Sequence, residues 1–186
     1  LLQAASEGLL QLPDFQRSYV WTVDDVRSLI ASVAKGFPVG ALLTLETGGP
    51  VSFEPRPIEG VTAAPAQAAQ LLLDGQQRIT SLYQALWSRD PMVTRLKKDQ
   101  RTAVRRYFYL DIAKAIAEGE DIEDAVAAVR EDRRIYDDFK VAIDLSTREK
   151  EYEAGAFPLN LIYDPTESMS WLFGWADYWQ RRGQPV

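Results

Sequence analysis

The feature that most constrains the fold is a predicted strand-to-helix corner near the middle of the chain. Residues 71–73 are leucines that run into Asp74 and predict a buried strand, and Gly75 marks a tight turn. An apolar stripe at helical spacing follows, formed by Ile79, Leu82, Tyr83 and Leu86. The polar residues between these elements therefore lie at a helix start, where backbone N–H groups are free to bind an anion.

The polar residues of this corner suit phosphate chemistry. Asp74 is a candidate ligand for Mg²⁺, which prefers oxygen donors. Gly75 allows a ligand to approach the backbone closely, and Arg78 carries a planar guanidinium that pairs well with phosphate oxygens. From these residues alone, a tight turn with a capping aspartate and a solvated arginine is an equally good interpretation.

A second Gln-Arg pair, Gln16-Arg17, lies beside Tyr19 and Trp21. A guanidinium next to aromatic rings can hold a phosphate while a ring stacks on a base. Two such pairs, at 16–17 and 77–78, favour convergence on one anion. The plainer interpretation is that Tyr19 and Trp21 are core residues next to a helix start.

The composition excludes several kinds of chemistry. The chain contains no cysteine and no histidine, so thiol nucleophiles, histidine-based zinc sites and Ser-His-Asp triads are ruled out. A general base must be a carboxylate, a lysine, a tyrosine or bound water. Neither a P-loop nor a Rossmann glycine pattern is present. Further candidate magnesium ligands are Asp14, Glu46 and Asp111, for which surface or capping roles are favoured.

Charge is unevenly distributed along the chain. The net charge of −6 argues against a protein whose whole surface binds nucleic acid. Residues 89–106 nevertheless hold seven basic and two acidic side chains, and we expect a basic linker or short helix over 89–102. It is either a solvated face or a contact with the DNA backbone. No segment resembles a membrane span or signal peptide, so we expect a cytoplasmic protein with no membrane partner.

The remaining pattern predicts an α+β protein with a mixed sheet and packed helices. The short apolar run over residues 9–12 indicates an edge strand or entry segment, and residues 41–46 indicate a buried strand. A helix is expected over 23–35, with a capping box and a final glycine. Further elements are a strand over 107–112, a helix over 121–133 capped by Asp121 and a last helix capped by Thr166.

Two stretches resemble signatures of the GmrSD-type restriction endonuclease N-terminal domain family. Residues 12–21, LPDFQRSYVW, are similar to IPxYQRxYxW, and residues 71–83, LLLDGQQRITSLY, are similar to LDGQQRLTTLY. Residues 36–40, GFPVG, resemble the GYPIG link of the family. The resemblance covers nearly the whole chain. Phe15 stands where the signature has tyrosine, so a hydroxyl is missing there.

The resemblance implies a ParB/sulfiredoxin-like domain over residues 1–165 that binds and hydrolyses a nucleoside triphosphate with Mg²⁺. Residues 166–186 would begin a helical segment leading to a C-terminal region absent from this chain. The chain starts at Leu1, and we expect it to be a trimmed piece of a longer protein. In this family the nuclease is a separate histidine-metal domain, so the expected partners are a nuclease domain or subunit and modified DNA. Association of identical copies is left open.

The leading hypothesis is an NTP-hydrolysing regulatory domain of a DNA-defence protein. Asp74 would bind the metal or water, the amides after Gly75 would cradle phosphate, and the arginines would stabilise transition-state charge. The expected catalytic residues are Asp74, Arg78, Gln77 and Arg17. The expected nucleotide-binding residues are Gly75, Gln76, Gln77, Arg78, Gln16, Arg17, Tyr19 and Trp21.

Three other hypotheses remain at this point. The same corner could bind nucleotide or modified DNA without catalysis and act only as a conformational switch. The basic stretch over 89–106 could contact DNA in a sensor that has no nucleotide role. Nuclease chemistry within this chain would have to use carboxylates and lysine, because no histidine is available.

Overall fold

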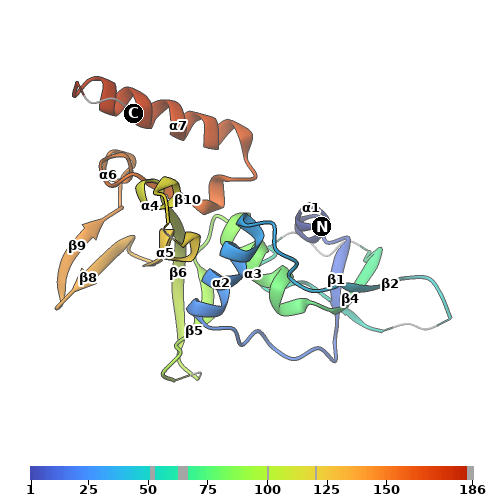
Figure 1. Cartoon of the computed structure of the whole chain (residues 1–186). Coiled ribbons are helices and arrows are strands. Elements are labelled where there is room, and N and C mark those ends of the chain that lie inside the picture. Colours follow the sequence, from blue (N-terminus) through green and yellow to red (C-terminus); the bar gives the residue numbers. More distant parts are fainter. Residues whose placement is uncertain (51–52, 63–66, 100, 120, 184–186) are drawn as a thin grey trace.

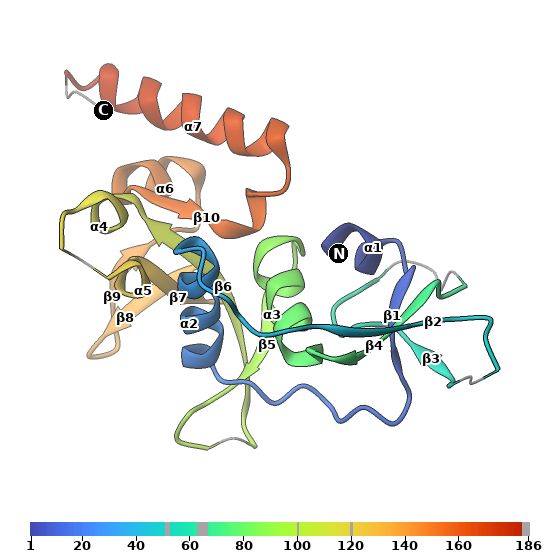
Figure 2. The same cartoon turned by 45° about the vertical axis from the view of Figure 1, so that its right-hand side comes forward.

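The computed structural model describes residues 1–50, 53–62, 67–99, 101–119 and 121–183. Two sheets lie on either side of a central helix, α3 (Gln76–Leu86), as Figures 1 and 2 show. This mixture of separate sheets and helices confirms the predicted α+β class. The predicted helix after Gly75 is therefore the element against which both halves of the chain pack.

The first sheet is mixed and has the strand order β2-β4-β1-β3. Strand β1 pairs in parallel with β4 and antiparallel with β3, while β2 and β4 are antiparallel. The predicted edge position of residues 9–12 is therefore wrong, because β1 is paired on both sides. β2 is also less buried than expected, with Leu43 58% exposed. The strands are β1 (Leu10–Pro13), β2 (Leu43–Glu46), β3 (Pro55–Arg56) and β4 (Gln70–Asp74).

The second sheet is built around the long strand β6 (Ala103–Asp111). β6 pairs antiparallel with each of its three neighbours, and a separate hairpin lies between β7 and β10 in the chain. Phe108 and Tyr109 point to opposite faces, and both are buried, so both faces of β6 are covered. The other strands are β5 (Met92–Arg95), β7 (Val126–Arg130), β10 (Ala156–Pro158) and the hairpin strands β8 (Arg134–Asp137) and β9 (Lys140–Asp144).

Helix α2 (Val23–Ala34) forms as its sequence predicts. Thr22 and Asp25 make the expected capping box, in which each side chain accepts a hydrogen bond from the backbone of the other. Gly36 follows the helix with a φ of +69°, which suits glycine. The other helical elements are α1 (Leu2–Ser6), α4 (Ile112–Ile116), α5 (Ile122–Ala125), α6 (Arg148–Ala154), the short 3₁₀ helix η1 (Leu159–Leu161) and α7 (Pro165–Gln180).

Three sequence-based expectations are wrong in detail. Residues 92–95 form β5 rather than a linker or helix, because Met92 and Thr94 alternate with outward-facing neighbours and pack inward. The helix expected over 121–133 lasts one turn after its Asp121 cap, since the valines that follow pair with β6 as β7. α7 is capped by Asp164, not Thr166, with proline in its first turn.

Two clusters of the core meet at α3, and a third packs against the other face of β6. Ile79 and Tyr83 pack with the apolar side chains of β1 and β4. Ala85 and Leu86 belong to a second cluster with residues of α2, β5, β6 and α7, including the buried Trp171. No helix in the described ranges is long and apolar enough to cross a membrane.

A buried carboxylate ties α6 and α7 to the second sheet. The Glu151 side chain is 4% exposed and accepts hydrogen bonds from Trp171 Nε1 at 3.0 Å and Tyr109 Oη at 3.2 Å. Arg148 and Arg133 form ion pairs with it at 3.0 and 3.4 Å. Burial and the nearby carboxylate raise the pKa of Tyr109, so its hydroxyl stays protonated as a donor.

We expect Glu151→Ala to lower the free energy of unfolding by about 2–4 kcal/mol, because it leaves buried donors without an acceptor. Urea denaturation followed by tryptophan fluorescence measures this change. Glu149→Ala, at an exposed position of the same helix, is the control and should stay within about 0.5 kcal/mol of the parent. Equal stability of the two variants would contradict a structural role for the buried carboxylate.

Candidate functional site

The corner between β4 and α3 has the backbone geometry that the sequence predicts. Gly75 is the N-cap of α3 with a φ of +93°, and a Cβ there would lie 2.2 Å from Leu42 Cδ2. Any other residue would strain the backbone and clash. No side chain caps α3, so the first-turn N–H groups, those of Gln76, Gln77 and Arg78, remain available to a ligand.

An irregular segment, residues 16–20, runs beside the first turns of α3 and is held there by buried glutamines. Gln76 Nε2 donates to the Arg17 carbonyl at 2.7 Å. Gln77 accepts from the Val20 amide at 3.0 Å and donates to the Ser18 carbonyl at 3.4 Å. These bonds replace the partners that a sheet or helix would give this backbone.

Gln16 holds the same segment to the end of β4, since its Nε2 donates to the Leu73 carbonyl at 2.6 Å. The two sequence motifs therefore bind each other. In this arrangement the side chains of Gln16, Gln76 and Gln77 position backbone, while their roles toward a ligand stay predictions.

Tyr19 lies apart from the other predicted nucleotide-binding residues. Its hydroxyl is 2.7 Å from Ser81 Oγ, which in turn donates to the Gln77 carbonyl. Burial raises the pKa of Tyr19 well above its ordinary value, so the hydroxyl is neutral. Its side chain lines a different and larger pocket from the one at the corner.

Arg78 is largely committed to internal contacts. Its guanidinium donates to the carbonyls of Val39 and Ala41, and its Nη2 lies 3.2 Å from Asp74 Oδ2. A Cβ on Gly40, which has a φ of +91°, would lie 2.3 Å from Arg78 Nη1. Glycine at residue 40 therefore allows the arginine to hold the link between α2 and β2 against the start of α3.

A pocket of about 250 Å³ opens at the corner. Arg17 is exposed there, and its guanidinium has no hydrogen-bond or ion-pair partner within the described ranges. The Asp74 side chain is 70% exposed. The volume lies below the roughly 300–1,000 Å³ of typical small-molecule sites, so the pocket suits a phosphate group better than a whole nucleotide. Its lining residues are Gln16, Arg17, Trp21, Asp74, Gly75, Gln76, Gln77 and Arg78.

The corner offers a metal ion one carboxylate. Among the residues that line the corner pocket, Asp74 is the only acidic one, and the described residues contain no cluster of three or more potential metal ligands. Asp14 does not line the pocket, Glu46 lies at the opposite end of β4 from Asp74, and Asp111 caps α4. Asp74 fits Mg²⁺ if phosphate and water supply the other oxygens, as this ion usually requires.

Arg56 and Gly40 contribute to the site but were not predicted as site residues. Arg56 donates to the carbonyls of Gln16 and Arg17 at 3.0 and 3.4 Å, and Glu59 pairs with it at 3.1 Å. The sequence Pro38-Val39-Gly40 is a local turn signal that could have indicated Gly40. No local pattern marks Arg56, because its contact depends on the pairing of β1 with β3.

The fold and the corner pocket define an α+β domain with a candidate phosphate site between a strand and a central helix. Residues 1–163 match the family described as GmrSD restriction endonuclease, N-terminal domain, and the chain belongs to that family. An uncharacterized protein of Methanocaldococcus jannaschii, MJ0686, is 30% identical over 173 residues. That alignment covers 87% of this chain but 28% of the relative. No solved structure matches the chain significantly, so the ParB/sulfiredoxin-like arrangement stays a prediction.

We expect Gly40→Ala to destabilise the protein more than Gly36→Ala. Both glycines have positive φ, but a Cβ at residue 36 meets open space, whereas one at residue 40 meets Arg78. Backbone strain should cost each variant about 1 kcal/mol, and displacing Arg78 should cost Gly40→Ala roughly 1–2 kcal/mol more. Urea denaturation of both variants measures the difference. Equal losses of unfolding free energy would refute the role of Gly40 in making room for Arg78.

Proposed function

We propose that the chain is an NTP-binding and hydrolysing regulatory domain of a restriction protein. The observation that carries this proposal is Arg17, an exposed guanidinium without an internal partner, placed in one pocket with uncapped helix amides and an exposed aspartate. These are the parts that phosphoryl transfer requires: a phosphate cradle, a mobile cation and an oxygen ligand for a metal ion.

Each group at the corner has a proposed role in binding or hydrolysing the nucleotide. The first-turn amides of α3 would bind phosphate oxygens, and Arg17 would stabilise negative charge as it develops in the transition state. Asp74 would hold Mg²⁺ together with phosphate and water. Arg78 would orient Asp74 through their 3.2 Å contact while it maintains the clamp on residues 39–41. Gln77 would support turnover by fixing the segment that carries Arg17.

The family supplies the wider context of the proposal. A GmrSD N-terminal domain points to a longer restriction protein with a nuclease domain or subunit that acts on modified DNA. The chain contains no histidine, which a histidine-metal nuclease would need. We therefore assign this domain the regulatory step and the partner region the cleavage step.

A non-catalytic switch is the second candidate. It is favoured by the single carboxylate at the pocket, Asp74, which is already paired with Arg78. In that case nucleotide or modified DNA would bind at the corner and shift the 16–20 segment without phosphate release. A tight-binding nucleotide that is recovered intact after prolonged incubation would support this alternative.

We expect Arg17→Gln to lower NTP turnover by about 100-fold, because one positioned donor to transition-state charge is worth this much. The free energy of unfolding should stay within about 0.5 kcal/mol of the parent, since Arg17 has no internal partner to lose. Phosphate release from each of the four NTPs with Mg²⁺ measures the activity.

Lys98→Gln is the matched control, because it removes the same charge from an exposed loop that does not line the corner pocket. Its turnover should equal that of the parent. Unchanged turnover in Arg17→Gln would refute the assignment. Arg78→Ala is a weaker test, because loss of its backbone contacts would also loosen the fold.

We expect a bound NTP with Mg²⁺ to raise the free energy of unfolding by about 2.7 kcal/mol when its concentration is a hundred times its Kd. Removing the metal with a chelator should abolish most of this gain, because the pocket supplies one carboxylate and the ion must bridge it to phosphate. Thermal unfolding with and without chelator measures the effect. A gain that is unaffected by the chelator would contradict a metal at Asp74.

A further inference from the structure

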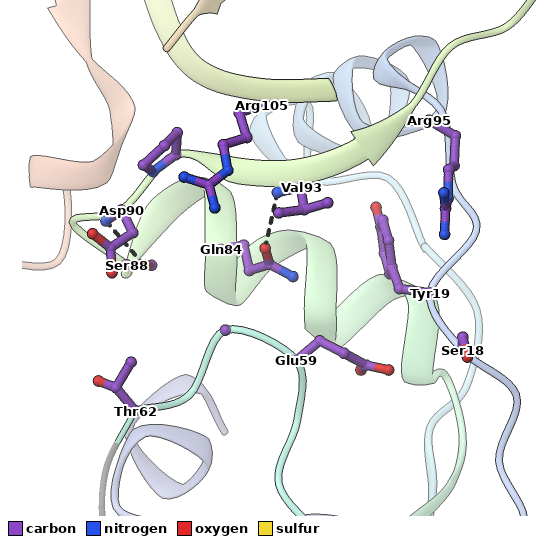
Figure 3. A pocket seen from close by; sticks show the side chains of 12 residues that line it. Ser18, Tyr19, Glu59, Thr62, Gln84, Ser88, Asp90, Val93, Arg95 and Arg105 are labelled. Atoms are coloured by element: carbon purple, nitrogen blue, oxygen red, sulfur yellow. Dashed lines mark hydrogen bonds between the residues drawn. The ribbon is translucent and has the colours of Figure 1, made fainter. Parts of the chain in front are cut away.

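A second pocket, with a volume of about 630 Å³, is lined in part by the 16–20 segment and is drawn in Figure 3. Ser18 and Tyr19 line it, whereas Gln16 and Arg17 line the corner pocket. The second half of α3, the β5–β6 hairpin and the loop after β3 form its other walls. It therefore differs from the proposed phosphate site in both position and residues.

Gln84 presents an amide donor without a protein partner to this pocket. The residue is 7% exposed, and its Oε1 accepts from the Val93 amide at 3.3 Å. That bond fixes the orientation of the amide and leaves Nε2 with no acceptor within the described part of the chain. Figure 3 shows the group pointing into the pocket from α3. This donor is therefore available to a ligand in the pocket.

Glu59 supplies the complementary acceptor on the opposite wall. Its Oε1 pairs with Arg56 at 3.1 Å, while Oε2 is buried and has no hydrogen-bond partner among the described residues. Gly60 follows it, and a Cβ there would lie 2.7 Å from Gln84 Cγ, so glycine lets this loop approach the helix.

The β5–β6 hairpin adds positive charge and an apolar surface. Val93 and Arg95 lie on the pocket face of β5, and Arg105 pairs opposite Val93 in the sheet register. Arg105 is 61% exposed, and its closest carboxylate, Glu131, is 3.9 Å away, so its guanidinium can turn to a ligand. These arginines come from the basic stretch that the sequence singles out.

We propose that this pocket binds a nucleobase, with guanine preferred. Guanine carries adjacent N–H donors for the Glu59 carboxylate and acceptors for Gln84 Nε2 and Arg105. Pro91 and Val93 supply apolar surface along the face of the ring. The base would come from a guanine nucleotide or from an unpaired guanine in DNA. This inference goes beyond the proposed phosphate chemistry and does not depend on it.

The test uses the purified 186-residue chain with GMP, AMP and two DNA hairpins, one fully paired and one with a single unpaired guanine. Calorimetry should show that GMP binds more tightly than AMP, or that the hairpin with the unpaired guanine binds more tightly than the fully paired hairpin. Gln84→Glu keeps the acceptor for Val93 and replaces the free donor, so it should weaken that binding by roughly tenfold or more. Urea denaturation checks that this variant is folded.

Arg105→Gln is a second variant at an exposed position and should also weaken binding, by about tenfold. Arg101→Gln removes the same charge from an exposed position outside the pocket and should leave affinity unchanged. GMP binding with this pattern assigns the pocket to nucleotides, and hairpin binding alone assigns it to unpaired DNA bases. Absence of both, or affinity that is insensitive to Gln84→Glu and Arg105→Gln, overturns the inference.

Inorganic tripolyphosphate separates this inference from the proposed function. It lacks a base, so it should compete at the corner pocket and depend on Arg17, with no response to Gln84→Glu. GMP binding in a protein that neither binds tripolyphosphate nor hydrolyses any NTP would preserve the base pocket and remove the phosphate site. NTP turnover without any binding of guanine would do the reverse.

Discussion

The structure depends on the hydrogen bonds by which two buried glutamines of α3 hold an irregular segment of backbone. Residues 16–20 belong to neither sheet, yet they lie beside a helix that is almost entirely buried. Their polar backbone groups need partners, and Gln76 and Gln77 supply them from one turn of α3. Shortening either side chain would leave carbonyl or amide groups unpaired at the centre of the molecule. This requirement explains both glutamines without reference to a ligand.

The same segment lines both pockets. Arg17 faces the corner, and its neighbours Ser18 and Tyr19 line the larger pocket. The segment is held by side-chain bonds rather than by a sheet ladder, and it contributes to the walls of both pockets. A ligand that draws Arg17 toward phosphate would change the hydrogen bonds at Gln77 and the wall formed by Tyr19. Physical coupling of the two sites therefore requires no long pathway, only this short stretch of backbone.

The sequence predicts the corner well because its determinants are local. A run of leucines, a glycine and a helical stripe define β4, Gly75 and α3, and the structure confirms each of them. The prediction of secondary structure fails where it depends on pairing with a strand that is distant in the sequence. In the sequence, the valines after Asp121 fit a helix as well as a strand, and their pairing with β6 decides the outcome. Likewise, β5 resembles a linker in the sequence, because only the folded structure shows that Met92 is part of the core.

The limits at the candidate site have the same origin. Proximity of the two Gln-Arg motifs is predicted correctly, but their hydrogen bonds to each other are not, since single motifs do not reveal which backbone groups lack partners. The glutamine that matters for the larger pocket, Gln84, looks like an ordinary polar helix position in the sequence. Its significance comes from Val93, which occupies its oxygen and leaves its nitrogen free.

The two arginines of the corner show how the structure separates stability from function. Arg78 gives its guanidinium to two backbone carbonyls and Asp74, and a glycine at residue 40 is present to make room for it. The Arg17 guanidinium makes no hydrogen bond or ion pair in the described ranges, so its position contributes little to the stability of the fold. The side chains of Arg56 and Gln76 bind the backbone carbonyls of Gln16 and Arg17, and the Gln16 side chain ties this segment to the end of β4. The backbone of Arg17 is therefore fixed in place. An arginine whose backbone is held firmly and whose guanidinium is unpaired is positioned to bind a ligand from outside the chain.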